Sequence, residues 1–243
     1  MSIDRNAPPV RVAIITGASR GLGLALATGL AQRGARLVID ARGGHALETA
    51  RQTLADHTEV IAIPGSITDD AHRAALVAAA TSLGGLDLLI NNAGVLGPSP
   101  LPSLATYPID AYRDVLEVGA VAPLALVQRA LPLLRARSGA VINVTSDAAV
   151  EAYEGWGGYG SAKAALDHLS ATLAVEHPRV PVYSFDPGDM ATDLMREAFP
   201  GEDTSALPSP ESVVPALLRL VNGRLPSGRY RAVELRPALA VTA

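Results

Sequence analysis

The chain has 243 residues, of which 49% are hydrophobic, and its formal net charge is −4. This length suits one α/β domain with a sizeable core, and the hydrophobic content excludes a disordered chain. The absence of a basic block argues against nucleic acid or an anionic membrane as the main partner. Because cysteine is absent, there is no disulfide framework, thiolate nucleophile or thiolate metal site.

The N-terminal segment is short and polar and has no apolar signal core. No stretch approaches the roughly 20 uninterrupted apolar residues of a membrane span, so we expect a cytoplasmic protein. The histidines are scattered, without the spacing of metal ligands, and we expect them at the surface. We therefore predict no metal site from His45, His57, His72, His168 and His177.

Short apolar, β-branched runs alternate along the chain with segments of helical spacing. The first run predicts a strand at 10–16, and a glycine-rich turn then leads into a helix at 24–33. Further strands are expected at 36–40, 60–63, 86–90, 140–144, 180–185 and 229–233, and further helices at 45–56, 69–83, 109–135, 158–176 and 210–221.

Strands that alternate with helices of this length predict βαβ units and one parallel sheet of about seven strands, flanked by helices. No internal repeat or linker divides the chain, so we expect a single domain over 1–243, with 236–243 as a loose C-terminal tail. Pro123 and Pro132 are expected to bend or break the long helix.

A glycine-rich loop, Thr16–Gly23, joins the first strand to the first helix. Glycines there let the backbone turn sharply and approach a pyrophosphate, while the helix N-terminus offers free N–H groups. A lone glycine pattern is weak evidence, but this one lies in the first βα turn of a βαβ unit. The loop therefore predicts nucleotide binding.

The residues at the end of the second predicted strand help to distinguish an NAD site from an NADP site. NAD sites usually hold the ribose hydroxyls with an acid at this tip, and Asp40 fits that description. Neighbours on a strand face opposite ways, so Asp40 and Ala41 cannot both face the ribose. Arg20 and Arg42 together would make a clamp for a 2′-phosphate. The residues alone leave NAD and NADP both open.

Tyr159 and Lys163 lie four residues apart at the start of a predicted helix, and therefore on one face. Lys163 is the single lysine among the 20 basic residues. A nearby ammonium lowers a tyrosine pKa from its usual value of about 10, so such a phenol can pass a proton to a carbonyl oxygen. Tyr153 has no lysine four residues on, and we assign it no role. The alternative is an ordinary helix pair.

These features together resemble the motif set of the short-chain dehydrogenases/reductases. The matching residues are Thr16–Gly23, Asn91-Asn92-Ala93-Gly94, Ser146 and the Tyr159/Lys163 pair, in the family's order and spacing. The resemblance implies a Rossmann-type doubly wound fold and a nicotinamide-dependent oxidoreductase. It assigns catalytic roles to three residues: Tyr159 as general acid/base, Ser146 on the substrate oxygen and Lys163 on the nicotinamide ribose.

The resemblance also implies a cofactor site. Its register puts Ala41 where NAD-specific members carry an acid and Arg42 where NADP-specific members carry a base, so NADP is expected rather than NAD. The cofactor-binding residues are then expected to be Gly17, Ser19, Arg20, Gly21, Leu22, Gly23, Arg42, Ser66, Ile67, Asn92, Ala93, Gly94, Tyr159, Lys163, Pro187, Gly188 and Thr192.

Two positions depart from the family pattern. The family usually has an asparagine that kinks the long helix and orders a water in the proton relay, and Gly119 stands there. Glycine allows the kink but lacks the amide, so restoring asparagine is expected to raise the rate or leave it unchanged. Ser66 stands where the family commonly has an aspartate beside the adenine, and a serine still forms hydrogen bonds.

The leading expectation is an NADP(H)-dependent enzyme that passes a hydride between the nicotinamide and a ketone or secondary alcohol. The alternative, motivated by Gly119, is a nucleotide-binding regulator or scaffold with weakened catalysis. The family also implies a homodimer or homotetramer, formed through the helices at 109–135 and 158–176.

Three segments are expected to form the substrate pocket: Leu96–Leu101, Asp147–Trp156 and Met190–Phe199. Within them, Trp156 and Phe199 either stack on a substrate ring or pack against their neighbours. The proline-bounded stretch at 190–208 is expected to be a loop that leaves the site open or forms a small lid.

Overall fold

The computed structural model describes residues 10–223 and 225–235, and the predicted tail at 236–243 lies outside them. Seven strands form one sheet in the order β3-β2-β1-β4-β5-β6-β7, and every neighbouring pair is parallel. This confirms the predicted doubly wound sheet. The strands are β1 (Val12–Ile15), β2 (Arg36–Ala41), β3 (Val60–Pro64), β4 (Leu88–Asn91), β5 (Ala140–Val144), β6 (Val182–Asp186) and β7 (Gly228–Arg231).

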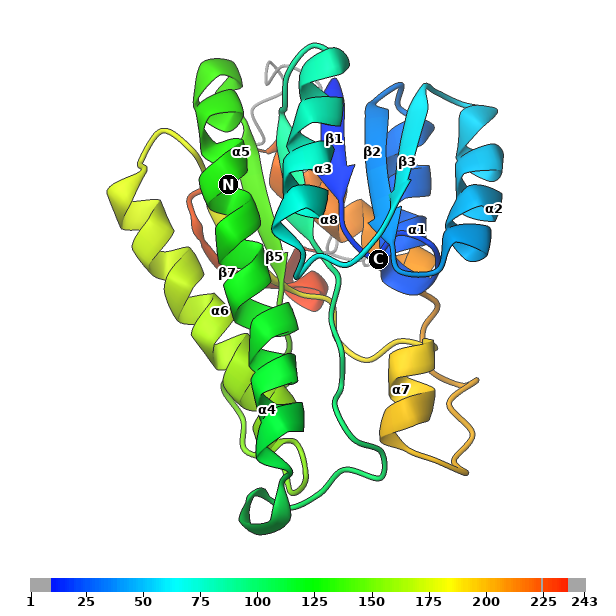
Figure 1. Ribbon diagram of the computed structural model, residues 1–243, viewed down its shortest axis with the longest axis vertical. Coiled ribbons are helices and arrows are strands. Elements are labelled where there is room, and N and C mark those ends of the chain that lie inside the picture. Colours follow the sequence, from blue (N-terminus) through cyan, green and yellow to red (C-terminus); the bar gives the residue numbers. More distant parts are fainter. Residues whose placement is uncertain (1–9, 224, 236–243) are drawn as a thin grey trace, which may run out of the picture.

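Helices cover both faces of the sheet (Figure 1). One face carries α1 (Gly21–Ala31), α2 (Gly44–Ala55) and α8 (Val214–Asn222), whose apolar side chains share one core cluster. The other carries α3 (Asp70–Ser82), α5 (Ala122–Arg137) and α6 (Gly157–Glu176) over a second cluster. Figure 1 also shows α4 (Ile109–Leu116) and α7 (Asp193–Ala198) extending beyond the sheet.

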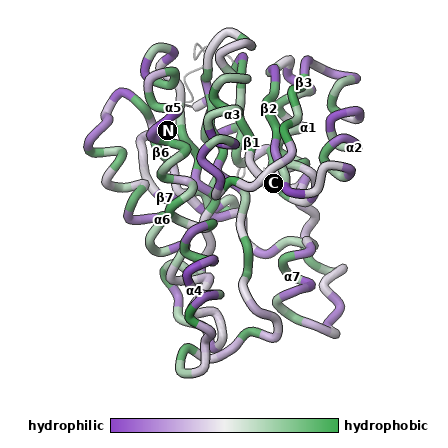
Figure 2. The backbone as a smooth tube through the Cα atoms, viewed as in Figure 1, coloured by the Kyte–Doolittle hydropathy of each residue, from purple (hydrophilic) through white to green (hydrophobic). Residues whose placement is uncertain are grey.

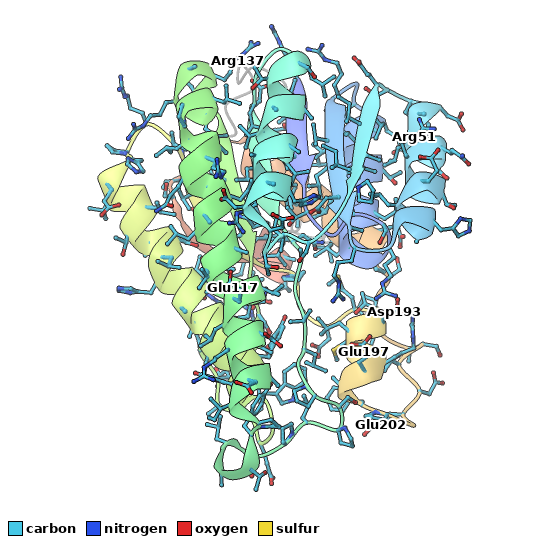
Figure 3. All side chains as sticks on the ribbon, viewed as in Figure 1. Arg51, Glu117, Arg137, Asp193, Glu197 and Glu202 are labelled. Atoms are coloured by element: carbon cyan, nitrogen blue, oxygen red, sulfur yellow. The ribbon has the colours of Figure 1, made fainter. Side chains whose placement is uncertain are left out.

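The inner strands are mainly apolar because both of their faces are covered, whereas the edge strand β7 carries Arg229 and Arg231. All four residues of β1 and the central four of β2 are buried, and all of these except Asp40 are hydrophobic (Figure 2). Charged side chains such as Arg137 and Glu202 lie at the periphery (Figure 3). The core thus consists of two apolar layers, one on each side of the sheet.

The long helix differs from the prediction in where it is interrupted. A π-helical turn, Glu117–Val121, separates α4 from α5, and neither proline breaks the helix. Pro123 lies in the first turn of α5, where a missing N–H group costs least, and Pro132 is accommodated inside the helix. The run Ile109–Arg137 is long and apolar enough to cross a membrane, but 44% of its most apolar window is buried against the rest of the protein.

The C-terminal third contains one helix that was not predicted. Helix α7 lies within the stretch expected to be a loop, and the Thr192 hydroxyl caps it by accepting from the Met195 N–H at 3.4 Å. Farther along, Pro210–Val213 forms a 3₁₀ turn before α8, and Ser209 makes no side-chain capping bond. The predicted helix at 210–221 therefore begins as a 3₁₀ turn.

Candidate active site

The glycine-rich loop passes from β1 into α1 with little room for side chains. Gly17 and Gly21 have positive φ angles of 67° and 55°, which favour glycine. A Cβ added at Gly23 would lie 2.3 Å from the Gly17 carbonyl oxygen. The helix N-terminus has no side-chain cap, because Arg20 makes no capping bond. Its N–H groups therefore remain available to an anion.

The Asp40 carboxylate fixes the start of the glycine-rich loop. The carboxylate accepts from the Gly17 N–H at 2.8 Å and lies 2.9 Å from His72 Nε2, and both side chains are buried. Asp40 is therefore engaged inside the protein rather than free to hold a ribose. The expectation that His72 lies at the surface was wrong, because its side chain is buried in contact with the Asp40 carboxylate.

The two residues that follow Asp40, Ala41 and Arg42, both line the cavity. Arg42 is exposed there, and within the described ranges it has no hydrogen bond or ion pair. Arg20 also lines the cavity, but its guanidinium pairs with Asp193 of α7 at 2.8 Å. The predicted two-arginine clamp thus has one unpaired member, Arg42.

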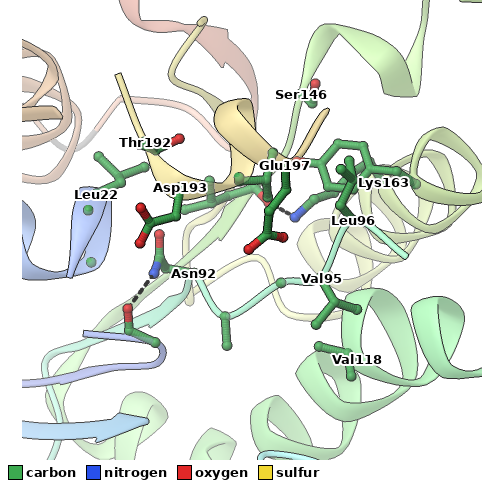
Figure 4. Close-up of a pocket in the computed structure, with 18 of the residues that line it drawn as sticks. Leu22, Asn92, Val95, Leu96, Val118, Ser146, Lys163, Thr192, Asp193 and Glu197 are labelled. Atoms are coloured by element: carbon green, nitrogen blue, oxygen red, sulfur yellow. Dashed lines mark hydrogen bonds between the residues drawn. The ribbon is translucent and has the colours of Figure 1, made fainter. Parts of the chain in front are cut away.

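The end of the cavity next to Arg42 is formed by the segment after β3. Ser66 and Ile67 both line it, as predicted for the adenine side. The Ser66 hydroxyl lies 2.8 Å from that of Thr68, which fixes its position. Farther in, the Asn92 amide donates to the Thr16 carbonyl at 2.8 Å and to the Gly17 carbonyl at 3.2 Å (Figure 4), so the end of β4 is tied to the glycine loop.

Ser146, Tyr159 and Lys163 converge on the same cavity, which has a volume of about 1550 Å³. Lys163 and Tyr159 come from the first turns of α6, whereas Ser146 follows β5. The Lys163 ammonium lies 5.5 Å from the centre of the Tyr159 ring and donates to the Val144 carbonyl at 2.7 Å (Figure 4). Tyr159 is 9% and Lys163 4% exposed.

Burial dominates the proton affinities of this pair. It lowers the pKa of Lys163 to about 8, because the ammonium loses its water. It also raises the pKa of Tyr159, and the charges of Asp186 and Asp147 act in the same direction. A hydrogen bond with Ser146 opposes this rise. The expected lowering of the tyrosine pKa by Lys163 is therefore not present in this structure.

The π-helical turn occurs where the family pattern has its asparagine. Gly119 lies inside it and is buried. A Cβ added to Gly119 would lie 2.8 Å from the Cβ of Ala162, the residue before Lys163. The helix is thus interrupted at this position by a π-helical turn, which frees backbone groups from the helix ladder. The close approach of Ala162 also leaves no room for a larger side chain.

The segment after β6 closes the cavity beside the tyrosine. The Gly188 N–H donates to Asp186 at 3.0 Å, and Pro187 and Gly188 line the cavity as predicted. Arg229 of β7 fixes this corner, because it donates to the Asp186 carboxylate and to the Ser146 carbonyl, each at 3.0 Å. Sequence reasoning missed Arg229, whose partners lie far away along the chain.

The three predicted wall segments all line the cavity. Trp156 lies 5.7 Å from Tyr159 and 6.0 Å from Phe199 between ring centres. The two aromatic side chains therefore pack against the site as well as lining it, so packing and substrate contact are compatible. The Ser99 hydroxyl donates to the Glu197 carbonyl at 2.7 Å, which joins one wall to α7.

Asp147 was predicted only as part of a wall, yet it is hydrogen-bonded to the catalytic candidate Ser146. Its carboxylate accepts from the Ser146 hydroxyl at 2.9 Å and from the Tyr153 hydroxyl at 3.0 Å. Tyr153, to which we assigned no role, therefore holds a carboxylate beside the site. The signal available in the sequence was the adjacency of an aspartate to the serine.

A nucleotide-sized cavity at the carboxyl ends of parallel strands, with a glycine loop at one end and a buried tyrosine and lysine at the other, defines a dinucleotide-binding oxidoreductase fold. The sequence model of the short chain dehydrogenase family matches residues 11–203. The chain therefore belongs to the short-chain dehydrogenase/reductase family.

Individual relatives agree with this assignment. A rhamnolipids biosynthesis 3-oxoacyl-(acyl-carrier-protein) reductase of Pseudomonas aeruginosa is 33% identical over 243 residues, covering 96% of this chain and 88% of that protein. The 2-(R)-hydroxypropyl-CoM dehydrogenase of Xanthobacter autotrophicus is 33% identical over 171 residues, or 69% of this chain and 68% of that one. An alcohol dehydrogenase structure from Thermococcus sibiricus, complexed with 5-hydroxy-NADP, has a TM-score of 0.82 at 26% identity and covers 94% of this chain and 99% of its own.

Proposed function

We propose that this protein is an NADP(H)-dependent oxidoreductase that reduces a ketone to a secondary alcohol, or runs that reaction in reverse. One observation carries the proposal: a single cavity holds an unpaired arginine, Arg42, at one end and the Ser146, Tyr159 and Lys163 set at the other. An oxidoreductase needs both a cofactor anchor and a proton donor, and the cavity is large enough to join them.

The residues at the cofactor end fit NADP. The glycine loop leaves backbone N–H groups and no side chain where a pyrophosphate would approach, because a Cβ at Gly17 or Gly23 would contact neighbouring backbone. Asp40 is held by Gly17 and His72, which removes the acid that an NAD site would use. Arg42 supplies an unpaired positive charge suited to a 2′-phosphate.

The protein's own part in the reaction is to bind, orient and move a proton. When bound, the nicotinamide supplies or accepts the hydride. Ser146 would donate a hydrogen bond to the carbonyl oxygen, and the Tyr159 hydroxyl would give that oxygen a proton. The raised pKa keeps Tyr159 protonated at neutral pH, which suits an acid in the reducing direction. Lys163 would hold the ribose and place a positive charge beside the phenol.

What is known of relatives is consistent with carbonyl chemistry, since one is a 3-oxoacyl reductase and another an alcohol dehydrogenase crystallised with 5-hydroxy-NADP. We further propose a cytoplasmic homo-oligomer that acts on a small molecule. Exposed apolar residues on the helices expected to form the contact support an oligomer: Val121 is 51% and Val175 81% exposed.

The second candidate is a nucleotide-binding regulator with weak catalysis. The missing amide at Gly119 is the observation that favours it. The two candidates differ in a simple assay. The protein is mixed with NADPH or NADH in parallel, together with a broad panel of ketones and aldehydes, and cofactor oxidation is followed.

The proposal expects turnover of at least one ketone, faster with NADPH than with NADH. Binding of NADPH, seen by its fluorescence, without turnover of any panel member would favour the regulator. Faster turnover with NADH would contradict the proposed cofactor.

A further inference from the structure

The buried Tyr159 needs a route by which its proton is replaced after each reduction. Only 9% of this residue is exposed, so bulk water does not reach the phenol freely. The π-helical turn offers no side chain for the purpose, because Gly119 has none and a Cβ there would meet Ala162. A second route would have to begin at another polar side chain in the cavity that Tyr159 lines.

Ser146 is such a side chain, and its hydroxyl has a hydrogen-bond acceptor in this structure. The Ala148 N–H donates to Ser146 Oγ at 3.2 Å, and the Ser146 hydroxyl donates to Asp147 Oδ1 at 2.9 Å. Ser146 and Tyr159 line the same cavity, and the Ser146 hydroxyl acts to lower the tyrosine pKa. The three side chains therefore follow one another along the cavity wall, from the phenol to the carboxylate.

Asp147 ends this chain at the cavity. Its side chain lines the open cavity and is only partly buried, unlike the phenol. A second hydrogen bond, from the Tyr153 hydroxyl at 3.0 Å to Oδ2, holds the carboxylate in place. A carboxylate that faces an open cavity and accepts from two hydroxyl groups is suited to collecting protons.

We propose that Asp147 is a proton-relay residue that returns a proton from the cavity to Tyr159 through Ser146. The inference rests on the proposed function. After Tyr159 has given its proton to the substrate oxygen, the Ser146 O–H bond breaks and a Tyr159 O–H bond forms. Ser146 takes a replacement proton from the Asp147 carboxyl group, which in turn takes one from water or a buffer acid. One proton thus enters for each hydride used.

Other charged groups face this corner, but none shares the same connection. Asp186 is paired with Arg229 at 3.0 Å. Asp189 also lines the cavity, and its pKa is raised by partial burial and by the charges of Asp147 and Asp186. Within the described ranges, no hydrogen bond joins Asp189 to Ser146. Asp189 therefore provides a control of equal charge in the same cavity.

The test compares the first turnover with the steady state in Asp147→Asn. Asparagine keeps the shape and an oxygen that can accept from Ser146, but it cannot carry the proton. Since the relay acts after hydride transfer, the first turnover of NADPH should change by less than about twofold, whereas the steady-state rate should fall roughly tenfold or more. Imidazole buffer, added at constant pH and ionic strength, should restore part of the steady-state rate.

Asp189→Asn, assayed in parallel, should show neither the loss nor the response to imidazole. Equal slowing of the first turnover and the steady state in Asp147→Asn would overturn the relay, since Asp147 would then only orient Ser146. An unchanged steady-state rate would overturn it as well. Absence of a first turnover in the unmodified protein would instead refute the proposed function, and the relay with it.

Discussion

Gly119→Ala is expected to destabilise the protein, although alanine is the better helix former. The added Cβ would lie 2.8 Å from the Cβ of Ala162, whereas apolar carbons are most stable roughly 3.5–4.0 Å apart. Both atoms lie on backbone-anchored positions, so neither can rotate away. Helix α6, which carries Ala162, must therefore move away from the π-helical turn that carries Gly119, or the turn itself must shift.

The size of the effect follows from two opposing contributions. Overpacking of a buried site costs about 1–3 kcal/mol, while replacing glycine by alanine in a helix gains up to about 1 kcal/mol. We expect a net loss of about 1 kcal/mol, which lowers the melting temperature by roughly 2–4 °C in a chain of this size. Thermal and urea unfolding of Gly119→Ala measure it.

Ala162→Gly supplies the matched partner for this experiment. In the double variant, the crowding is relieved, so the two changes should be less harmful together than their sum, by about 1–2 kcal/mol in a double-mutant cycle. A rise in stability for Gly119→Ala alone, or strict additivity in the cycle, would refute the packing argument. The larger Gly119→Asn change should then lower the reduction rate, because Lys163 follows Ala162. This reverses the expectation drawn from the sequence alone.

Two further predictions concern the ends of the cavity. Arg42→Ala should weaken NADPH binding by tenfold to a hundredfold, because a hydrogen bond to a charged group contributes about 1.5–3 kcal/mol. NADH binding should remain nearly unchanged. Equal losses of affinity for the two cofactors, measured by fluorescence titration, would contradict the 2′-phosphate contact. The pKa of Lys163 is lowered to about 8, so its ammonium is charged below that pH and neutral above it, and the reduction rate should fall as pH rises through about 8. In Lys163→Arg, the rate should be low at every pH, and this alkaline fall should disappear, since arginine stays charged. Retention of the fall would assign it to another group.

The strands were predictable because their chemistry is local. Runs such as Val12–Ile15 and Ala140–Val144 are short, apolar and β-branched, and both faces of the sheet are covered by helices. Helix ends were also near their predicted places where a local signal existed. Asp69, for example, caps α3 by accepting from the Ala71 N–H.

Features that depend on distant partners could not be predicted. The contact between Asp40 and His72 joins β2 to α3. The two residues are 32 positions apart in the sequence, and no local pattern around either one indicates the contact. Helix α7 has six residues, too few to give a clear hydrophobic period. The π-helical turn was expected from the family only as a kink, and the break expected at Pro123 or Pro132 does not occur.

The candidate site divides in the same way. The glycine loop and the Tyr159/Lys163 pair were found from sequence, because each is a local pattern. Their chemical environment was not, since the raised pKa of Tyr159 comes from burial and from Asp186 and Asp147, which belong to other elements. The network around Asp147 emerged only when the Ser146 hydroxyl could be assigned an acceptor.

Tyr159→Phe tests the central claim most directly. The change removes one oxygen from a buried ring, so the variant should fold and bind NADPH with an affinity within about twofold of the unmodified protein. If the phenol is the proton donor, kcat for ketone reduction should fall at least ~100-fold, the low end for a positioned general acid. A rate close to that of the unmodified protein would remove Tyr159 from the mechanism and contradict the account.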